Sequence, residues 1–156
     1  MSRKMFSVKK ICTSGVMMAL YIVLMTLTRG FAVGQYQIRI ATAMYALAAP
    51  FPYLIIPLGL ANGLSNLFFS TPMDAIFGFV IGVATCTVVY LIRRRKLPDF
   101  LIALPICLVV GFGVPLWLTH MLQVPYWVLV ASLLVGQAVC GVVGVLLVKV
   151  VNRFAR

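Results

Sequence analysis

Long apolar runs, separated by short connections that hold proline, glycine or basic residues, make up most of this 156-residue chain. A helix needs about 20 residues to cross the roughly 30 Å hydrocarbon layer of a membrane. The runs predict spans at approximately residues 11–28, 38–50, 53–69, 72–92, 99–119 and 126–148. We therefore expect an all-α membrane protein with six transmembrane helices, forming a single integral membrane domain over residues 1–156.

A proline pair divides the apolar stretch 38–69. Pro50 and Pro52 each remove a helical hydrogen bond and restrict the preceding residue, which favours two spans over one. The charge pattern favours the same division. With two spans, the N-terminal basic residues, the Arg93 to Lys96 block and the C-terminal basic residues all face the cytoplasm, so both termini are predicted to be cytoplasmic.

The composition supports a membrane location. Hydrophobic residues make up 63% of the chain, and its mean hydropathy is +1.13. The formal net charge of +11 would suggest nucleic acid for a soluble protein, but here the basic residues flank apolar runs. Such blocks mark cytoplasmic loops and contact anionic lipid headgroups. We expect a multi-pass protein of the cell membrane that contacts the lipid bilayer and binds no nucleic acid.

Polar side chains gather in the apolar stretch between residues 35 and 90. Hydrocarbon disfavours an unpaired polar group by several kcal/mol, so these residues need partners. The pattern predicts a small-molecule site that includes Gln35, Gln37, Arg39, Asn62, Asn66 and Asp74. Asp74 also has a structural explanation, because Thr71, Pro72 and Asp74 form a capping-box-like helix start.

Three further features bear on the site or on packing. Gln137 falls near the middle of the last span, where a buried amide needs a partner. Trp117 suits either an interfacial aromatic belt or ring stacking in a site. Gly15 and Ala19 give the first span a face of small residues, which allows another helix to approach, whether from this protein or from a partner.

Catalytic chemistry is not indicated. The chain has one histidine, no glutamate and no phosphate-binding loop of the G-x-x-x-x-G-K-[ST] type. His120 has no second ligand at metal-binding spacing, and the four cysteines are scattered through apolar runs. We expect no enzyme activity, no cofactor and no metal site.

The sequence resembles the substrate-binding S components of energy-coupling factor (ECF) transporters, and within them the QueT family. The resemblance rests on QIRIA at residues 37–41, PLGLANGLSNL at 57–67 and DAIFG at 74–78, with weaker similarity over 136–149. It implies a six-helix S-component-like bundle without its own ATPase. It also implies glutamate at two positions where this chain has Thr42 and Gln137.

The resemblance further implies a function and partners. The substrate would be a queuosine precursor, a 7-deazaguanine such as preQ0 or preQ1, or queuine. A transmembrane coupling subunit and two ATPase subunits would drive transport, with Gly15 and Ala19 in contact with the partner. The ligand-binding residues would be Gln37, Arg39, Thr42, Asn62, Asn66, Asp74, Trp117 and Gln137, with Tyr36, Tyr45 or Trp117 stacking on the ring.

Several alternatives stay open from the sequence. Arg39 would either pair with Asp74 or extend to the membrane interface. The protein could instead be an S component for another vitamin or a purine-like compound, a stand-alone secondary carrier, or a structural membrane protein. Each of these alternatives predicts a different response to ligands and to partner subunits.

Overall fold

The computed structural model describes residues 7–32 and 38–154, and in these residues the regular structure is entirely helical. The elements in chain order are α1 (Val8–Leu27), α2 (Arg29–Ala32), η1 (Ile40–Ala48), η2 (Pro52–Leu54), α3 (Ile55–Phe69), α4 (Pro72–Arg94), η3 (Asp99–Ile102), α5 (Ala103–Gly113), α6 (Pro115–Leu122) and α7 (Tyr126–Phe154). Here α denotes α-helix and η denotes 3-10 helix.

Five segments of the described chain are long and apolar enough to cross a membrane. They are Val8–Leu27, Pro52–Phe69, Pro72–Arg94, Asp99–Leu122 and Tyr126–Phe154. Each overlaps one of the predicted spans. The fourth of them is built from η3, α5 and α6, and Pro115 begins α6 at a position where its missing N–H disturbs the helix least.

The structure differs from the prediction at residues 38–50, where the sequence analysis expected a membrane span. This region holds η1, a 3-10 helix of nine residues, and not a membrane-spanning helix. At about 2 Å per residue it extends roughly 18 Å, well short of the roughly 30 Å hydrocarbon layer. Eight of the nine residues are buried, so the apolar character of this run reflects contact with other helices.

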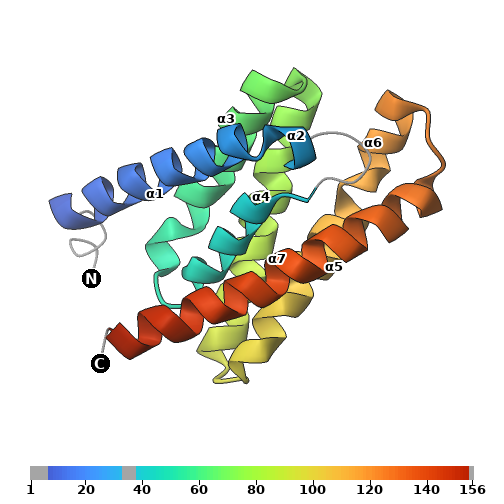
Figure 1. Cartoon of the computed structure of the whole chain (residues 1–156). Helices are drawn as coiled ribbons and strands as arrows, with labels where there is room; N and C mark the ends of the chain where they lie inside the picture. The colour runs from blue at the N-terminus through green and yellow to red at the C-terminus, as the bar shows by residue number, and fades with distance from the viewer. Residues whose placement is uncertain (1–6, 33–37, 155–156) are drawn as a thin grey trace.

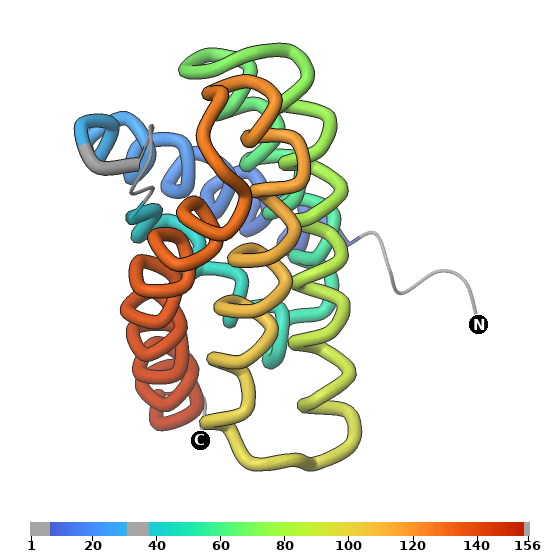
Figure 2. Tube along the Cα trace, turned by 90° about the vertical axis from the view of Figure 1, so that its right-hand side faces the viewer, coloured from blue at the N-terminus to red at the C-terminus, as the bar shows by residue number. Residues whose placement is uncertain are grey.

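The helices surround η1. In Figure 1 and in the perpendicular view of Figure 2, η1 lies between α7 on one side and α3 and α4 on the other. Helix α1 lies across α3. Only 11% of the residues in its most apolar stretch are buried inside the protein, whereas the other candidate spans bury 28–50% of theirs. Most of the surface of α1 is therefore open to lipid or to a partner.

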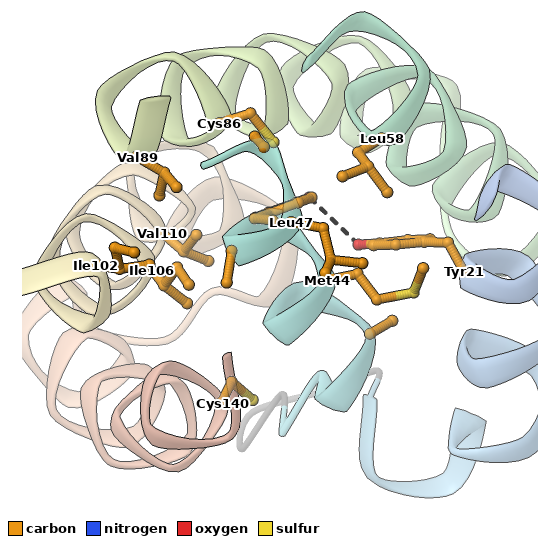
Figure 3. Packing of buried hydrophobic residues seen from close by; sticks show 14 of the residues in the cluster. Tyr21, Met44, Leu47, Leu58, Cys86, Val89, Ile102, Ile106, Val110 and Cys140 are labelled. Carbon is orange, nitrogen blue, oxygen red and sulfur yellow. Dashed lines mark hydrogen bonds between the residues drawn. The ribbon is translucent and has the colours of Figure 1, made fainter. Parts of the chain in front are cut away.

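The apolar core fills the space around η1. Tyr21 and Met25 are the two buried residues of α1, and Figure 3 shows Tyr21 pointing from α1 towards the core residues Met44 and Leu58. Other members of the core include Cys86, Val89, Ile102, Ile106, Val110 and Cys140, which belong to α4, η3, α5 and α7.

Glycines bring α3 and α4 close together. A Cβ on Gly82 would lie 3.0 Å from Gly59 Cα and 3.1 Å from the Tyr45 hydroxyl oxygen. A Cβ on Gly78 would clash with Asn66 Nδ2. Small residues at helix contacts allow such close approach in membrane proteins. Because α3 and α4 pack so closely, the polar side chains of α3 reach the first turns of α4.

Candidate functional site

Arg39, which precedes η1, lies at the centre of a buried polar cluster. Its Nη2 lies 3.6 Å from Asp74 Oδ2, and the two side chains are 3% and 1% exposed. Of the two alternatives that the sequence leaves open for Arg39, the structure shows pairing with Asp74 and not extension to the membrane interface. We call Arg39, Asn62, Asn66, Asp74 and Trp117 the Arg39 cluster.

Two asparagines one helical turn apart on α3 join Arg39 to α4. Asn66 Oδ1 accepts a hydrogen bond from Arg39 Nη1 at 3.0 Å, and Asn66 Nδ2 donates to the Asp74 carbonyl at 3.0 Å. Asn62 repeats the arrangement, with Oδ1 at 3.5 Å from Arg39 Nη1 and Nδ2 donating to the Gly78 carbonyl at 2.7 Å. The i, i+4 spacing of the two residues places both amides on one face of α3.

Asp74 occupies the first turn of α4, where Thr71 caps the helix. Thr71 Oγ1 accepts from the Asp74 N–H at 3.2 Å, which confirms the predicted cap. The Asp74 side chain turns towards Arg39 and Trp117 instead. Trp117 Nε1 donates to Asp74 Oδ1 at 2.9 Å, and the Trp117 ring stacks on Phe77 with centroids 5.0 Å apart.

A second polar contact lies on the other side of Arg39. The Thr42 hydroxyl lies 2.7 Å from the Arg39 carbonyl oxygen and 2.8 Å from Gln137 Oε1, and its one proton serves either acceptor. Cys140 Sγ donates to the Arg39 carbonyl at 3.2 Å. Thr42 and Gln137 stand at the two positions where the family resemblance implies glutamate. Because they contact each other, the two departures from the family pattern lie at one place in the structure.

Two tyrosines extend the polar contacts into the core: Tyr45, which the family resemblance offered as a ring-stacking residue, and Tyr21, which the sequence analysis did not include. The hydroxyl of Tyr21 donates to Asn62 Oδ1 at 3.2 Å and lies 3.2 Å from the hydroxyl of Tyr45. The two rings stack with centroids 5.9 Å apart. The available signal was a phenol hydroxyl in the middle of an apolar span, which needs a partner when buried.

The remaining predicted residues divide by location. Gln37, together with Gln35 and Tyr36, lies outside the described residues. Gly15 and Ala19 are exposed on α1, and a Cβ on Gly15 would meet no atom within 4 Å. Trp127 is 73% exposed and suits an interfacial position, whereas Trp117 is 9% exposed and belongs to the cluster.

No group of three or more metal-ligating His, Cys, Asp or Glu side chains occurs among the described residues. The chemistry that the cluster offers is hydrogen bonding from amides and an indole, around one cation and one anion. Such a set can orient a polar solute in an apolar site, because a few fixed polar groups determine specificity.

Replacing Trp117 with phenylalanine tests the indole contact. The smaller ring keeps an aromatic surface against Phe77, but Asp74 Oδ1 loses its donor. We expect a loss of about 1–3 kcal/mol in unfolding free energy, the range for a buried group that loses its hydrogen bond. Trp127→Phe is the matched control and should cost less than about 0.5 kcal/mol, because Trp127 is exposed. Thermal unfolding in detergent compares the two, and equal losses would contradict the assigned contact.

Comparison with known proteins gives one family. A family model described as QueT transporter matches residues 11–153, nearly the whole chain. No curated protein matches the chain. No solved structure matches it.

Proposed function

Because the chain belongs to the QueT transporter family, we propose that it is the substrate-binding S component of an ECF transporter for a queuosine precursor. The family and the five apolar helices make it a multi-pass membrane transport protein. The proposed substrate is a 7-deazaguanine such as preQ0 or preQ1, or queuine. A transmembrane coupling subunit and two ATPase subunits would supply the energy.

The observation that carries the proposal is the Arg39 cluster. Its side chains come from α3, α4 and α6 and from Arg39, the residue before η1. All of them are buried in an apolar surrounding. Buried ionisable groups in membrane segments are costly and commonly mark transport pathways. A neutral, polar heterocycle could bind there through hydrogen bonds. We propose that Arg39, Thr42, Asn62, Asn66, Asp74, Trp117 and Gln137 form the substrate site, together with Gln37.

The position of the cluster along α4 supports access from the exterior. Asp74 lies in the first turn of α4, and Arg93 lies in the last turn. At 1.5 Å per residue these positions are roughly 30 Å apart, about the thickness of the hydrocarbon layer. If the basic connection at 95–98 is cytoplasmic, as the positive-inside rule indicates, the cluster lies near the outer surface.

The surface of α1 supports a partner contact. Gly15 and Ala19 are exposed, and the apolar face around them includes Ile11, Val16 and Val23. Small residues flanked by apolar ones permit close helix–helix contact in a membrane. We propose that this face of α1 contacts the coupling subunit.

A thermal-shift screen of the purified chain tests the proposed substrate. A ligand that binds only the native state stabilises it, by about 2.7 kcal/mol at a concentration one hundred times Kd. We expect preQ0, preQ1 or queuine to raise Tm, and common vitamins to leave it unchanged. A shift with a vitamin alone would favour an S component of different specificity. Uptake into vesicles that lack ATPase subunits would favour a stand-alone carrier.

A further inference from the structure

The hydroxyl of Tyr21 joins α1 to the Arg39 cluster. Tyr21 is one of the two buried residues of α1, and Figure 3 shows it pointing from the helix into the core. Its hydroxyl donates to Asn62 Oδ1 at 3.2 Å. The hydroxyls of Thr13 and Thr26, in contrast, donate to carbonyls of α1 itself. Tyr21 therefore connects a largely exposed helix to the polar groups of the proposed site.

The side-chain amide of Asn62 is held by contacts from three elements. Its Nδ2 donates to the Gly78 carbonyl oxygen of α4 at 2.7 Å, an atom that can only accept. The amide oxygen must then face the other two contacts, the Tyr21 hydroxyl at 3.2 Å and Arg39 Nη1 at 3.5 Å. Tyr21 is the closer of these two donors. Its hydroxyl thus helps to fix the orientation of an amide that also contacts Arg39.

Tyr45 on η1 holds the Tyr21 side chain in place. The two rings stack with centroids 5.9 Å apart, and their hydroxyl oxygens are 3.2 Å apart. Because the single Tyr21 proton goes to the Asn62 oxygen, Tyr45 is the donor between the two hydroxyls. The three side chains are at most 4% exposed. A buried chain of hydrogen bonds with one direction, from Tyr45 through Tyr21 to Asn62, restrains the rotation of the Asn62 amide.

Resting on the proposed substrate site, we infer that Tyr21 is a positioning residue for substrate binding. It holds Asn62, and through Asn62 the Arg39 guanidinium, in the arrangement that meets the substrate. Tyr21 acts through these two residues without contacting the substrate. The packing of α1 against α3 is then a condition of tight binding, although α1 contributes no member of the Arg39 cluster.

Replacing Tyr21 with phenylalanine tests the role of the hydroxyl. The ring can still stack on Tyr45, but Asn62 Oδ1 loses its closer donor. We expect the dissociation constant for preQ1 to rise about three- to tenfold, the effect of losing one hydrogen bond. Titration calorimetry of the full chain, purified in detergent, measures this constant.

Tyr126→Phe is the matched control. The Tyr126 hydroxyl donates to the Phe112 carbonyl at 3.1 Å, a contact that involves no member of the Arg39 cluster. This variant also loses one tyrosine hydrogen bond, but it leaves the contacts of Asn62 in place. We expect it to bind preQ1 as tightly as the wild-type chain.

A double-mutant cycle separates positioning from a general loss of stability. In a chain that carries Asn62→Ala, the Tyr21 hydroxyl has no amide to hold. Adding Tyr21→Phe should then change the dissociation constant for preQ1 by less than about twofold, because residues that act through one contact are not additive. A purely structural effect of Tyr21 would instead raise the constant by about three- to tenfold again.

The outcomes separate this inference from the proposed function. Equal dissociation constants for Tyr21→Phe and Tyr126→Phe, or additive effects in the cycle, would overturn the inference and leave the proposed function intact. The comparison of the two single variants decides by itself if Asn62→Ala does not fold or does not bind. Binding of none of preQ0, preQ1 and queuine to the wild-type chain would contradict the proposed function.

Discussion

Replacing Gly78 with alanine is expected to abolish tight substrate binding while the helices stay folded. The added Cβ would clash with Asn66 Nδ2 and would lie 3.2 Å from Asn62 Nδ2. The Asn66 side chain must then rotate away, which breaks its bonds to Arg39 and to the Asp74 carbonyl. We expect a stability loss of about 1–3 kcal/mol for the buried amide, partly offset by the helix propensity of alanine.

Gly15→Ala provides the matched control for this prediction. It is the same change in another apolar helix, at a position where the new Cβ meets no atom within 4 Å. We expect Tm and substrate affinity of this control to stay close to the wild-type values. Calorimetry with preQ1 and thermal unfolding in detergent measure both effects. A Gly78→Ala variant that binds preQ1 as tightly as Gly15→Ala would show that the two asparagines do not need their present positions.

The Arg39–Asp74 ion pair was one of the two alternatives that the sequence left open, because few partners for Arg39 were available. The chain has two acids, and Asp99 is separated from Asp74 by the length of α4. A buried arginine in an apolar region requires compensation, and Asp74 was the one acid predicted on its side of the membrane. The Thr71 cap was predicted from helix geometry alone, and the shared face of Asn62 and Asn66 follows from the same geometry. These contacts depend on local spacing or on charge, which a sequence states directly.

Other features depend on packing and could not be read in the same way. An apolar run of about thirteen residues fits a short membrane span and a buried segment equally well. The run that holds η1 is a buried segment, because α3, α4 and α7 enclose it. Trp117 occurs near a predicted interface, yet the tertiary fold turns its indole to Asp74. The contact between Thr42 and Gln137 joins residues 95 positions apart, which no local pattern encodes.

Replacing Asp74 with asparagine is expected to give the largest loss of stability among these variants. The change keeps the shape of the side chain and an oxygen for Trp117, but it leaves the Arg39 charge buried without a counter-ion. Removing one partner of a buried ion pair typically costs about 3–5 kcal/mol. Asp99→Asn removes the other acid as a matched control. Its pair with Arg93 is short at 2.7 Å but partly exposed, at 40% and 26%, so the loss should stay below about 1 kcal/mol.

The double variant Arg39→Met with Asp74→Asn separates structural from ligand-binding roles. With both charges removed, no buried charge lacks a partner, and most of the stability lost in Asp74→Asn should return. Substrate affinity should not return, because the hydrogen-bonding groups of Arg39 and the carboxylate are absent. Denaturant unfolding in detergent and titration with preQ1 measure the two quantities separately. A double variant that is stable and binds preQ1 like the wild type would make the ion pair a structural feature alone and would move the substrate site elsewhere. Stability regained without binding would instead tie the charge pair to the solute, since the fold would then need only two uncharged side chains at these positions.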